Sequence, residues 1–333
     1  MKLIIQIPCF NETGTLAVTL ADLPRSVEGF GVVEWLVIDD GSTDGTANLA
    51  RELGVDHVVT HSVNRGLATA FMTGLHECLA QGADVIVNTD ADNQYRGSDI
   101  PALTAPIVNG RADMVIGARP IDDTQHFSWL KKKLQRLGSW AVRKASRTEV
   151  LDAPSGFRAI SRESAFRLNV FSAYTYTLET IIQAGLSNLR VVSVPIHTNA
   201  DLRPSRLVKS ISSYVRRSLM TIFRVFLIYR PLAMFFGVAM LFLLAGGAVG
   251  LRFLYYYLTG NGAGHVQSVV FTGLCLTIGS LLLMMGFIAD IIAVNRKLLE
   301  RIELRLKYLQ HPGDQAAAAA NRNQSVKPTV DRT

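Results

Sequence analysis

The chain has 333 residues and a formal net charge of +7, and 49% of its residues are hydrophobic. This length holds a core domain of about 200 residues together with further segments. The basic residues gather around long apolar runs, and no nucleic-acid motif accompanies them, so we exclude nucleic acid as the partner. Cys9, Cys78 and Cys275 lack the spacing of a zinc or redox motif.

Strand-like and helix-like patterns alternate along the first third of the chain. The expected strands cover residues 3–7, 32–38, 57–60, 85–89 and 114–118, and the expected helices cover 13–23, 46–53, 67–79 and 100–108. This alternation predicts a Rossmann-like α/β domain with a mostly parallel sheet covered by helices. The patterns GxGxxG and GxxxxGK[ST] do not occur, so neither a dinucleotide site nor a P-loop has support.

Two further strands and a helix are expected beyond this region. The strands cover residues 156–160 and 191–196, and the helix covers 176–184. Pro195 cannot donate a hydrogen bond to a neighbouring strand, so we place the strand that contains it at an edge of the sheet.

Polar side chains follow three of the expected strands. Asn11 and Glu12 follow the first, Asp39 follows the second, and Asp90 and Asp92 follow the fourth. In open α/β sheets, ligands bind beyond the carboxyl ends of the strands, and two carboxylates one residue apart can hold a divalent cation against a diphosphate. The alternative is an Asx-rich turn after a strand. Repetition at three strand ends favours a nucleotide site.

Two apolar segments are long enough to span a membrane. Residues 232–251 and 268–289 contain no charged side chain, and each would cross a hydrocarbon core of roughly 30 Å as a helix. A pair of buried core helices is the alternative. Lys and Arg lie before the first segment and after the second, whereas residues 259–267 have neither. The positive-inside rule therefore predicts a multi-pass protein of the cytoplasmic (inner) membrane with the soluble domain and both termini cytoplasmic.

Three further segments have amphipathic helical patterns. Residues 127–146 combine basic residues with Trp129 and Trp140, which predicts a helix lying on the membrane surface, with a core-packed helix as the alternative. Similar patterns occur before the first span and after the second. The expected organisation is a cytosolic α/β domain at 1–205, a juxtamembrane helix at 206–230, two spans at 231–294, an amphipathic helix at 295–310 and a disordered tail at 311–333.

Five motifs in this order resemble the inverting glycosyltransferases of family 2, and within them the branch that acts on polyprenyl phosphates. They are Ile7-Pro8-Cys9-Phe10-Asn11-Glu12, Asp39-Asp40-Gly41-Ser42-Thr43-Asp44, Asn64-Arg65-Gly66, Asp90-Ala91-Asp92-Asn93-Gln94 and Ser155-Gly156-Phe157-Arg158. The resemblance covers residues 2–309 and includes the two spans. It implies a nucleotide-diphospho-sugar transferase fold, a UDP- or GDP-linked sugar donor and an undecaprenyl or dolichyl phosphate acceptor in the lipid bilayer.

The resemblance also implies roles for individual residues. The donor would contact Pro8, Asn11, Glu12, Asp39, Asn64, Gly66 and Asp90. Mg²⁺ or Mn²⁺ would be bound by Asp90, Asp92 and Gln94, which offer oxygen ligands. The acceptor phosphate would contact Arg119, Ser155, Arg158, Arg203, Ser205 and Arg206. The residues expected to be catalytic are Asp90, Asp92 and Asp152.

Some positions are ambiguous or depart from the family pattern. Asp40 and Asp44 either contact the donor or hold the shape of their loop. Leu151 stands where many relatives have a basic residue, and Ser205-Arg206 replaces a Ser-Lys pair.

Other functions stay open. A processive polysaccharide synthase is disfavoured because the chain has no QxxRW motif and only two expected spans. A transferase acting on a glycolipid or other acceptor is a closer alternative. A non-catalytic membrane scaffold that binds nucleotide sugars is a third. The sequence leaves the sugar, the general base and homo-oligomerisation undetermined.

Overall fold

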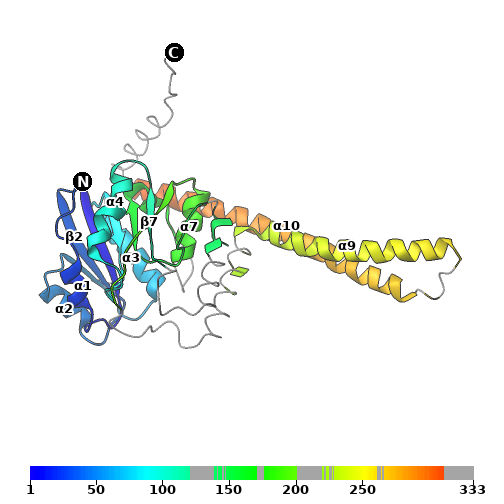
Figure 1. Ribbon diagram of the computed structural model, residues 1–333, viewed down its shortest axis with the longest axis horizontal. Coiled ribbons are helices and arrows are strands. Elements are labelled where there is room, and N and C mark those ends of the chain that lie inside the picture. The colour runs from blue at the N-terminus through cyan, green and yellow to red at the C-terminus, as the bar shows by residue number, and fades with distance from the viewer. Residues whose placement is uncertain are drawn as a thin grey trace, which may run out of the picture. The chain divides into compact units, whose positions relative to one another are not determined.

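The computed structural model describes residues 1–120, 139–170 apart from 141, 145 and 147, 176–200, 229–260 and 266–310, with 220, 223, 224, 227 and 264. Its first unit contains a seven-stranded sheet with the order β3-β2-β1-β4-β6-β5-β7 (Figure 1). The strands are β1 (Lys2–Cys9), β2 (Val32–Asp39), β3 (His57–Thr60), β4 (Val85–Asn88), β5 (Met114–Ala118), β6 (Arg158–Ser161) and β7 (Val191–Pro195).

The sheet is mostly parallel, as predicted, with β6 as the antiparallel exception. In this strand Arg158 pairs with Asn88 of β4 and Ser161 pairs with Val85. The amino-terminal end of β6 therefore lies where its antiparallel neighbours β4 and β5 end. β7 pairs with β5 and forms one edge of the sheet, which confirms the position predicted from Pro195.

Helices cover both faces of the sheet. They are α1 (Leu16–Asp22), α2 (Thr46–Glu52), α3 (Leu67–Ala80), α4 (Ile100–Val108), α6 (Arg162–Arg167) and α7 (Thr177–Leu186), with a short 3-10 helix, η1 (Gly97–Asp99), before α4. Alternate β1 residues such as Leu3 and Ile5 pack in the same core as residues of α1 and α4. Gln6, on the opposite face, approaches Gly74 of α3. The alternating pattern of the strands thus produces a three-layer domain.

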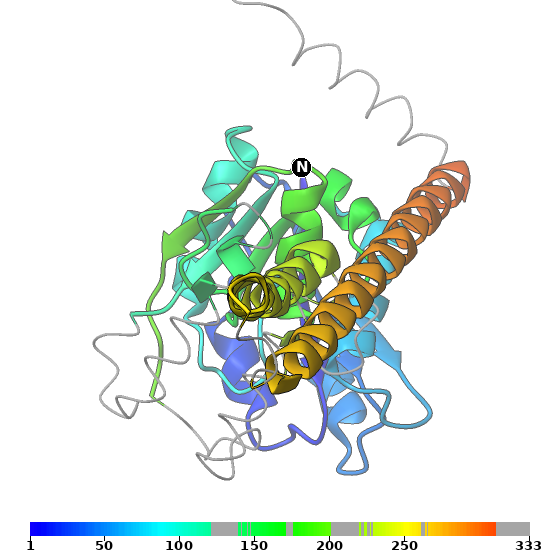
Figure 2. The same ribbon diagram turned by 90° about the vertical axis from the view of Figure 1, so that its right-hand side faces the viewer.

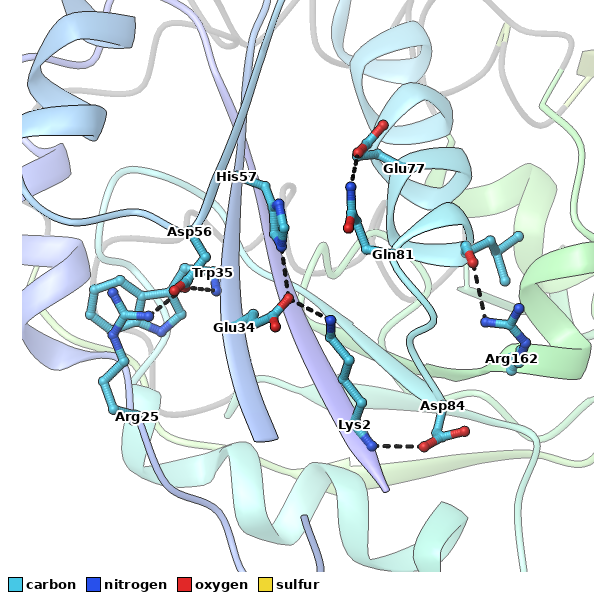
Figure 3. Close-up of polar contacts among 11 residues, drawn as sticks. Lys2, Arg25, Glu34, Trp35, Asp56, His57, Glu77, Gln81, Asp84 and Arg162 are labelled. Atoms are coloured by element: carbon cyan, nitrogen blue, oxygen red, sulfur yellow. Dashed lines mark hydrogen bonds and ion pairs between the residues drawn. The ribbon is translucent and has the colours of Figure 1, made fainter. Parts of the chain in front are cut away.

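Ion pairs and hydrogen bonds join the starts of the strands (Figure 3). Glu34 lies 2.8 Å from Lys2 Nζ and 2.7 Å from His57 Nε2. The Lys2 backbone N–H donates to Asp84 Oδ2 at 2.7 Å. Burial raises the pKa of Glu34, but the hydrogen bonds from Lys2 and His57 outweigh it and the pKa is lowered. Glu34 therefore has basic side-chain partners, whereas Asp84 is bonded by a backbone N–H.

The second unit contains one long apolar helix and most of another. They are α9 (Pro231–Leu258) and α10 (Val266–Gln310), and they lie side by side (Figure 1). Glycines allow the close contact, because a Cβ at Gly246 would lie 2.8 Å from Cys275 Cβ and one at Gly279 would lie 2.7 Å from Leu243 Cδ2.

Both helices are long and apolar enough to cross a membrane, over residues 231–258 and 266–296. In the most apolar 18-residue stretch of each helix, only 11% and 17% of the residues are buried, which does not fit the alternative of buried core helices. The second expected span and the amphipathic helix after it were treated as separate elements. They are one unbroken helix, α10 (Figure 2).

Several expected segments lie wholly or mostly outside the described residues. These are the interfacial helix at 127–146, of which 139, 140, 142–144 and 146 are described as helical, the juxtamembrane helix at 206–230, and the tail at 311–333. Their predicted structures stay predictions.

Candidate active site

The sheet order brings the polar strand ends into one row. β2, β1 and β4 are parallel neighbours, so Asp39, Asn11 and Asp90 follow adjacent strand ends at the same edge. Next in the row comes the start of the antiparallel β6, preceded by Asp152, and then the end of β5, followed by Arg119. Residues predicted for donor, metal and acceptor are thus arranged in that order along the edge.

The donor-side loops after β1 and β2 are tied to each other. Asn11 adopts a left-handed φ of 55°, its N–H donates to Ser42 Oγ at 2.8 Å, and its Oδ1 accepts from the Thr43 N–H at 2.9 Å. The Glu12 N–H donates to Thr46 Oγ1 at 3.0 Å. These hydrogen bonds join the two loops. The strands that precede them, β1 and β2, contain the buried Pro8 and Asp39.

Asp44 also links the loops after β1 and β2. Its Oδ1 accepts from the Thr46 N–H at 3.1 Å, and its Oδ2 accepts from Thr13 Oγ1 at 2.9 Å. Burial raises its pKa, but these hydrogen bonds outweigh it and the pKa is lowered. Of the two interpretations of Asp44, the geometry favours the maintenance of the loop.

Asp40 holds a third loop, which contains Asn64 and Gly66. Its Oδ1 accepts from the Arg65 N–H at 2.9 Å and its Oδ2 from the Gly66 N–H at 2.8 Å. His61 Nδ1 lies 2.8 Å from the same carboxylate. With both oxygens used and only 3% of the residue exposed, Asp40 shapes the loop.

Asp90 and Asp92 lie in the turn after β4, and their region combines both interpretations of the sequence. An Asx turn is present, because the Gln94 N–H donates to Asp92 Oδ1 at 3.2 Å. Burial of its carboxyl group, followed by the charge of Asp92, raises the pKa of Asp90 to about 7. The charges of Arg119 and Arg158 oppose this rise. The charge of Asp92 is therefore close enough to disfavour the ionisation of Asp90.

The Gly156 backbone packs closely against the Asp90 carboxylate. A Cβ at this glycine would lie 3.0 Å from both Asp90 carboxylate oxygens. The Gly156 peptide is fixed on both sides, because its N–H donates to Tyr95 Oη at 3.0 Å and its carbonyl accepts from Asn88 Nδ2 at 2.9 Å. Asn88 Nδ2 also lies 2.9 Å from Tyr176 Oη. No local sequence pattern predicts these roles for Tyr95, Asn88 and Tyr176, because their contacts join residues far apart in the chain.

Arg119 and Asp152 form a two-point ion pair beside the carboxylates. Arg119 Nε lies 2.7 Å from Asp152 Oδ2, and Nη2 lies 3.1 Å from Oδ1. Asp152 is fully buried, while 17% of the Arg119 side chain is exposed. The arrangement fixes the guanidinium plane and leaves part of Arg119 accessible.

Arg158 is fully buried and bonded within the protein. It donates to the carbonyl oxygens of Ser155, Thr177 and Ala153, each at 2.8 Å, and to Thr180 Oγ1 at 2.6 Å. Burial lowers its pKa to about 10, so it stays charged at neutral pH. The structure therefore places a buried positive charge beside the site, while direct contact of Arg158 with a phosphate stays a prediction.

The remaining predicted residues are placed as follows. Ser155 is fully buried, and its Oγ has no hydrogen-bond partner among the residues that the structure describes. Arg203, Ser205 and Arg206 lie outside those residues. Gln94 contacts its neighbours through its main chain, whose carbonyl accepts from the Asn199 N–H at 2.9 Å.

The carboxylate pair fits a divalent cation that a substrate helps to bind. Within the described part of the chain, no group of three or more His, Cys, Asp or Glu side chains is arranged so that it could hold a metal ion by itself. Mg²⁺-type sites commonly use one or two carboxylates and complete the shell with substrate phosphates and water. The raised pKa of Asp90 agrees with such a site. So does Asn93 Oδ1 in the same turn, which is buried and has no hydrogen-bond partner among the residues described.

Comparison with known proteins identifies the family. The model of glycosyl transferase family 2 matches residues 4–171, half of the chain, and the chain belongs to this family. It is 29% identical over 206 residues to undecaprenyl-phosphate mannosyltransferase of Micrococcus luteus, a match that covers 59% of this chain and 83% of the relative. It is also 29% identical over 217 residues to UDP-N-acetylglucosamine–dolichyl-phosphate N-acetylglucosaminyltransferase of Methanococcus voltae, covering 58% and 83%.

Solved structures show the same fold. Glucosyl-3-phosphoglycerate synthase from Mycobacterium tuberculosis, in complex with phosphoglyceric acid, aligns with a TM-score of 0.52 and 23% identity, covering 66% of this chain and 79% of that one. A second structure of the synthase, with Mn²⁺, UDP-glucose and phosphoglyceric acid, has a TM-score of 0.51 with 23% identity and the same coverage. The domain therefore has a GT-A-like α/β fold.

Proposed function

We propose that this glycosyltransferase moves a sugar from a UDP- or GDP-linked donor to a polyprenyl phosphate, with inversion at the anomeric carbon and dependence on Mg²⁺ or Mn²⁺. The observation that carries the proposal is the position of Asp90 and Asp92. Along the sheet edge they lie between the donor-side loops and the Arg119–Asp152 pair. A nucleotide sugar and a lipid phosphate would thus meet above the two carboxylates.

Asp90 and Asp92 would hold the cation together with the donor diphosphate. The cation would supply positive charge to the departing nucleoside diphosphate. Asp90 must lose its proton for this role, and its pKa of about 7 makes cation binding weaker in acid. Gln94 as a third protein ligand is part of the proposal.

Arg119 is the accessible acceptor-side group. A guanidinium has five N–H donors, of which Nε and one on Nη2 are directed to Asp152. The others suit a phosphate monoester. Such a phosphate, with a second pKa near 6, is largely ionised at pH 7 and can attack the anomeric carbon without a protein base. Asp152 would then act by positioning Arg119, and Arg158 by its buried charge.

The two apolar helices support a lipid-linked acceptor. α9 and α10 would anchor the catalytic unit at the cytoplasmic face of the membrane, where a polyprenyl phosphate presents its head group. The two curated relatives at 29% identity are named for undecaprenyl phosphate and dolichyl phosphate, which are acceptors of this class.

The test is product identification from membranes that contain the full chain. They are incubated with Mn²⁺, undecaprenyl phosphate and each of a panel of labelled UDP- and GDP-sugars, and the extracted lipid is analysed by mass spectrometry. We expect one donor to label a polyprenyl phosphate sugar. Membranes with the Asp92→Asn variant, which keeps the size of the side chain, should give no labelled lipid.

Three other outcomes have distinct meanings. Labelled glycolipid without a labelled polyprenyl phosphate sugar would show that the acceptor is a glycolipid and not a polyprenyl phosphate. Donor binding without transfer to any added acceptor would favour a nucleotide-sugar-binding scaffold. Equal labelling by the wild type and Asp92→Asn would contradict the role of the carboxylate pair.

A further inference from the structure

The chain that follows β7 runs alongside the metal-binding turn. Thr198 forms an antiparallel bridge with Tyr95. The residues on either side of Thr198 make further contacts. The His197 N–H donates to Asp99 Oδ2 of η1 at 2.6 Å, and the Asn199 N–H donates to the Gln94 carbonyl of the turn at 2.9 Å. Residues 197–199 thus form a short strap across residues 93–99.

Asn199 makes most of the contacts between this strap and the turn. Besides its backbone N–H, its Nδ2 donates to the Asn93 carbonyl at 3.1 Å. Its Oδ1 accepts from Arg96 Nε at 3.1 Å. One residue therefore bonds three positions of the segment that follows Asp92, and a single carboxamide supplies both the donor and the acceptor.

The turn needs such support because its conformation is unfavourable. Asn93 has a φ of 55°, in the left-handed region, and a side-chain oxygen without a partner among the described residues. Left-handed backbone costs a non-glycine residue about 1 kcal/mol, although Asn tolerates it best. Within the turn, the Gln94 N–H donates to Asp92 Oδ1. External hydrogen bonds to the Asn93 and Gln94 carbonyls offset this cost.

The two carboxylates are thus held by different parts of the fold. Asp90 rests on Gly156, which Tyr95 and Asn88 fix. Asp92 is fixed by the turn that Asn199 braces from the strap. The separation of the two oxygen ligands then depends on both supports.

We propose that Asn199 is a positioning residue that holds Asp92 at the correct place for the divalent cation. The inference rests on the proposed function. The hydrogen bonds of Asn199 go to Asn93, Gln94 and Arg96 and not to either carboxylate, so it acts through the main chain of Asn93 and Gln94. Outer residues that orient metal ligands commonly change metal affinity by about 10-fold or more when they are replaced.

The test is a titration of the full-length protein in detergent with Mn²⁺, followed by electron paramagnetic resonance of free Mn²⁺, in the presence of UDP and separately of GDP. Asn199→Ala removes the two side-chain bonds and keeps the backbone bond. We expect its Mn²⁺ midpoint to rise about 10-fold. In the transfer assay, its turnover should recover at saturating Mn²⁺, because the reacting groups are unchanged.

His197→Ala is the matched control. His197 lies two residues away in the same strap, but its side chain contacts Asp99 of η1 at 3.1 Å and is 73% exposed. We expect an unchanged Mn²⁺ midpoint for this variant. Thermal unfolding of both variants would separate a general loss of stability from a change in metal affinity.

Two results would overturn the inference. One is a midpoint for Asn199→Ala within about twofold of the wild type, and the other is an equal rise for His197→Ala. If the wild type itself binds no Mn²⁺ with either nucleotide, the proposed function fails instead, so the two failures are distinguishable.

Discussion

Two carboxylates of the same sheet have opposite electrostatic surroundings. Glu34, at the edge where the strands begin, has Lys2 and His57 as partners, and its pKa is lowered despite burial. Asp90, at the other edge, has Asp92 nearby, and burial together with this charge raises its pKa to about 7. The first arrangement stabilises the fold. The second arrangement opposes the ionisation of Asp90, as expected of a functional site.

Asp90→Asn should stabilise the metal-free protein at alkaline pH. The folded-state pKa lies above the ordinary value of 3.8, so the unfolded chain loses its proton first and the free energy of unfolding falls as pH rises toward about 7. Asn has no such loss. In EDTA, the melting temperature of the variant should therefore exceed that of the wild type by more at about pH 8 than at about pH 5. An advantage that is equal at both pH values would contradict the raised pKa.

Asp92→Asn should abolish transfer without loss of the fold. The substituted carboxamide retains an Oδ1 that can accept the Gln94 N–H, so the turn persists, but it offers no charge to a cation. We expect turnover to fall about 100-fold or more while the melting temperature changes little. Wild-type turnover, measured with saturating donor and acceptor, would refute the assignment.

At the scale of the elements, three loops are locked together on the donor side. Gly41 lets two of them meet, since a Cβ there would lie 2.5 Å from the Val63 carbonyl carbon. Asp40 then bonds the N–H groups of Arg65 and Gly66. The loop that contains Asn64 is therefore positioned by the loop after β2.

Gly41→Ala and Gly45→Ala form a matched pair for this contact. Both glycines have positive φ, 73° and 88°, but nothing lies within 4 Å of a Cβ at Gly45. We expect Gly45→Ala to lower the free energy of unfolding by about 1 kcal/mol through backbone strain. Gly41→Ala should lower it by about 2 kcal/mol more through the clash, and should also weaken donor binding.

Thermal unfolding and donor titration check the two glycine variants. Equal losses of stability would show that the loops do not meet at Gly41. Unchanged donor affinity in a folded Gly41→Ala protein would separate the loop contact from the donor pocket.

The elements near the site show what sequence could predict. Strand-like segments that alternate with helix-like segments predicted β1, β2, β4 and β5. The polar residues at the ends of the first three could be predicted to lie near one another, because parallel strands end on the same side of a sheet. The direction of β6 could not be deduced, because antiparallel pairing of Arg158 with Asn88 joins residues 70 positions apart. The supports from Tyr95, Tyr176 and Asn199 are long-range contacts of the same kind.

The sequence predicts a boundary inside α10 for a different reason. Its composition changes from apolar to charged near Asn295, and we assigned a boundary there. Backbone hydrogen bonding in a helix does not depend on such a change, and Val266–Gln310 continues without a break.

At the scale of the whole molecule, the chain divides into a catalytic unit and a helical unit, which includes α9 and most of α10. Deletion of everything after Arg230 should leave donor binding intact, because the donor-side loops belong to the first unit. Transfer to long-chain undecaprenyl phosphate in vesicles should fall strongly, while a short-chain polyprenyl phosphate in solution should remain a substrate. Undiminished transfer to the vesicle acceptor would count against an anchoring role for the two helices.

Calorimetric titration of the full-length protein with UDP- and GDP-linked sugars, with Mn²⁺ and with EDTA, tests the central claim most directly. We predict that at least one sugar nucleotide binds in the presence of Mn²⁺ and binds much more weakly in EDTA. In Asp92→Asn, the gain in donor affinity that Mn²⁺ provides should be lost. Binding that is unaffected by EDTA and by Asp92→Asn, or the absence of binding by every donor, would contradict the claim that this carboxylate pair holds a cation against the donor diphosphate.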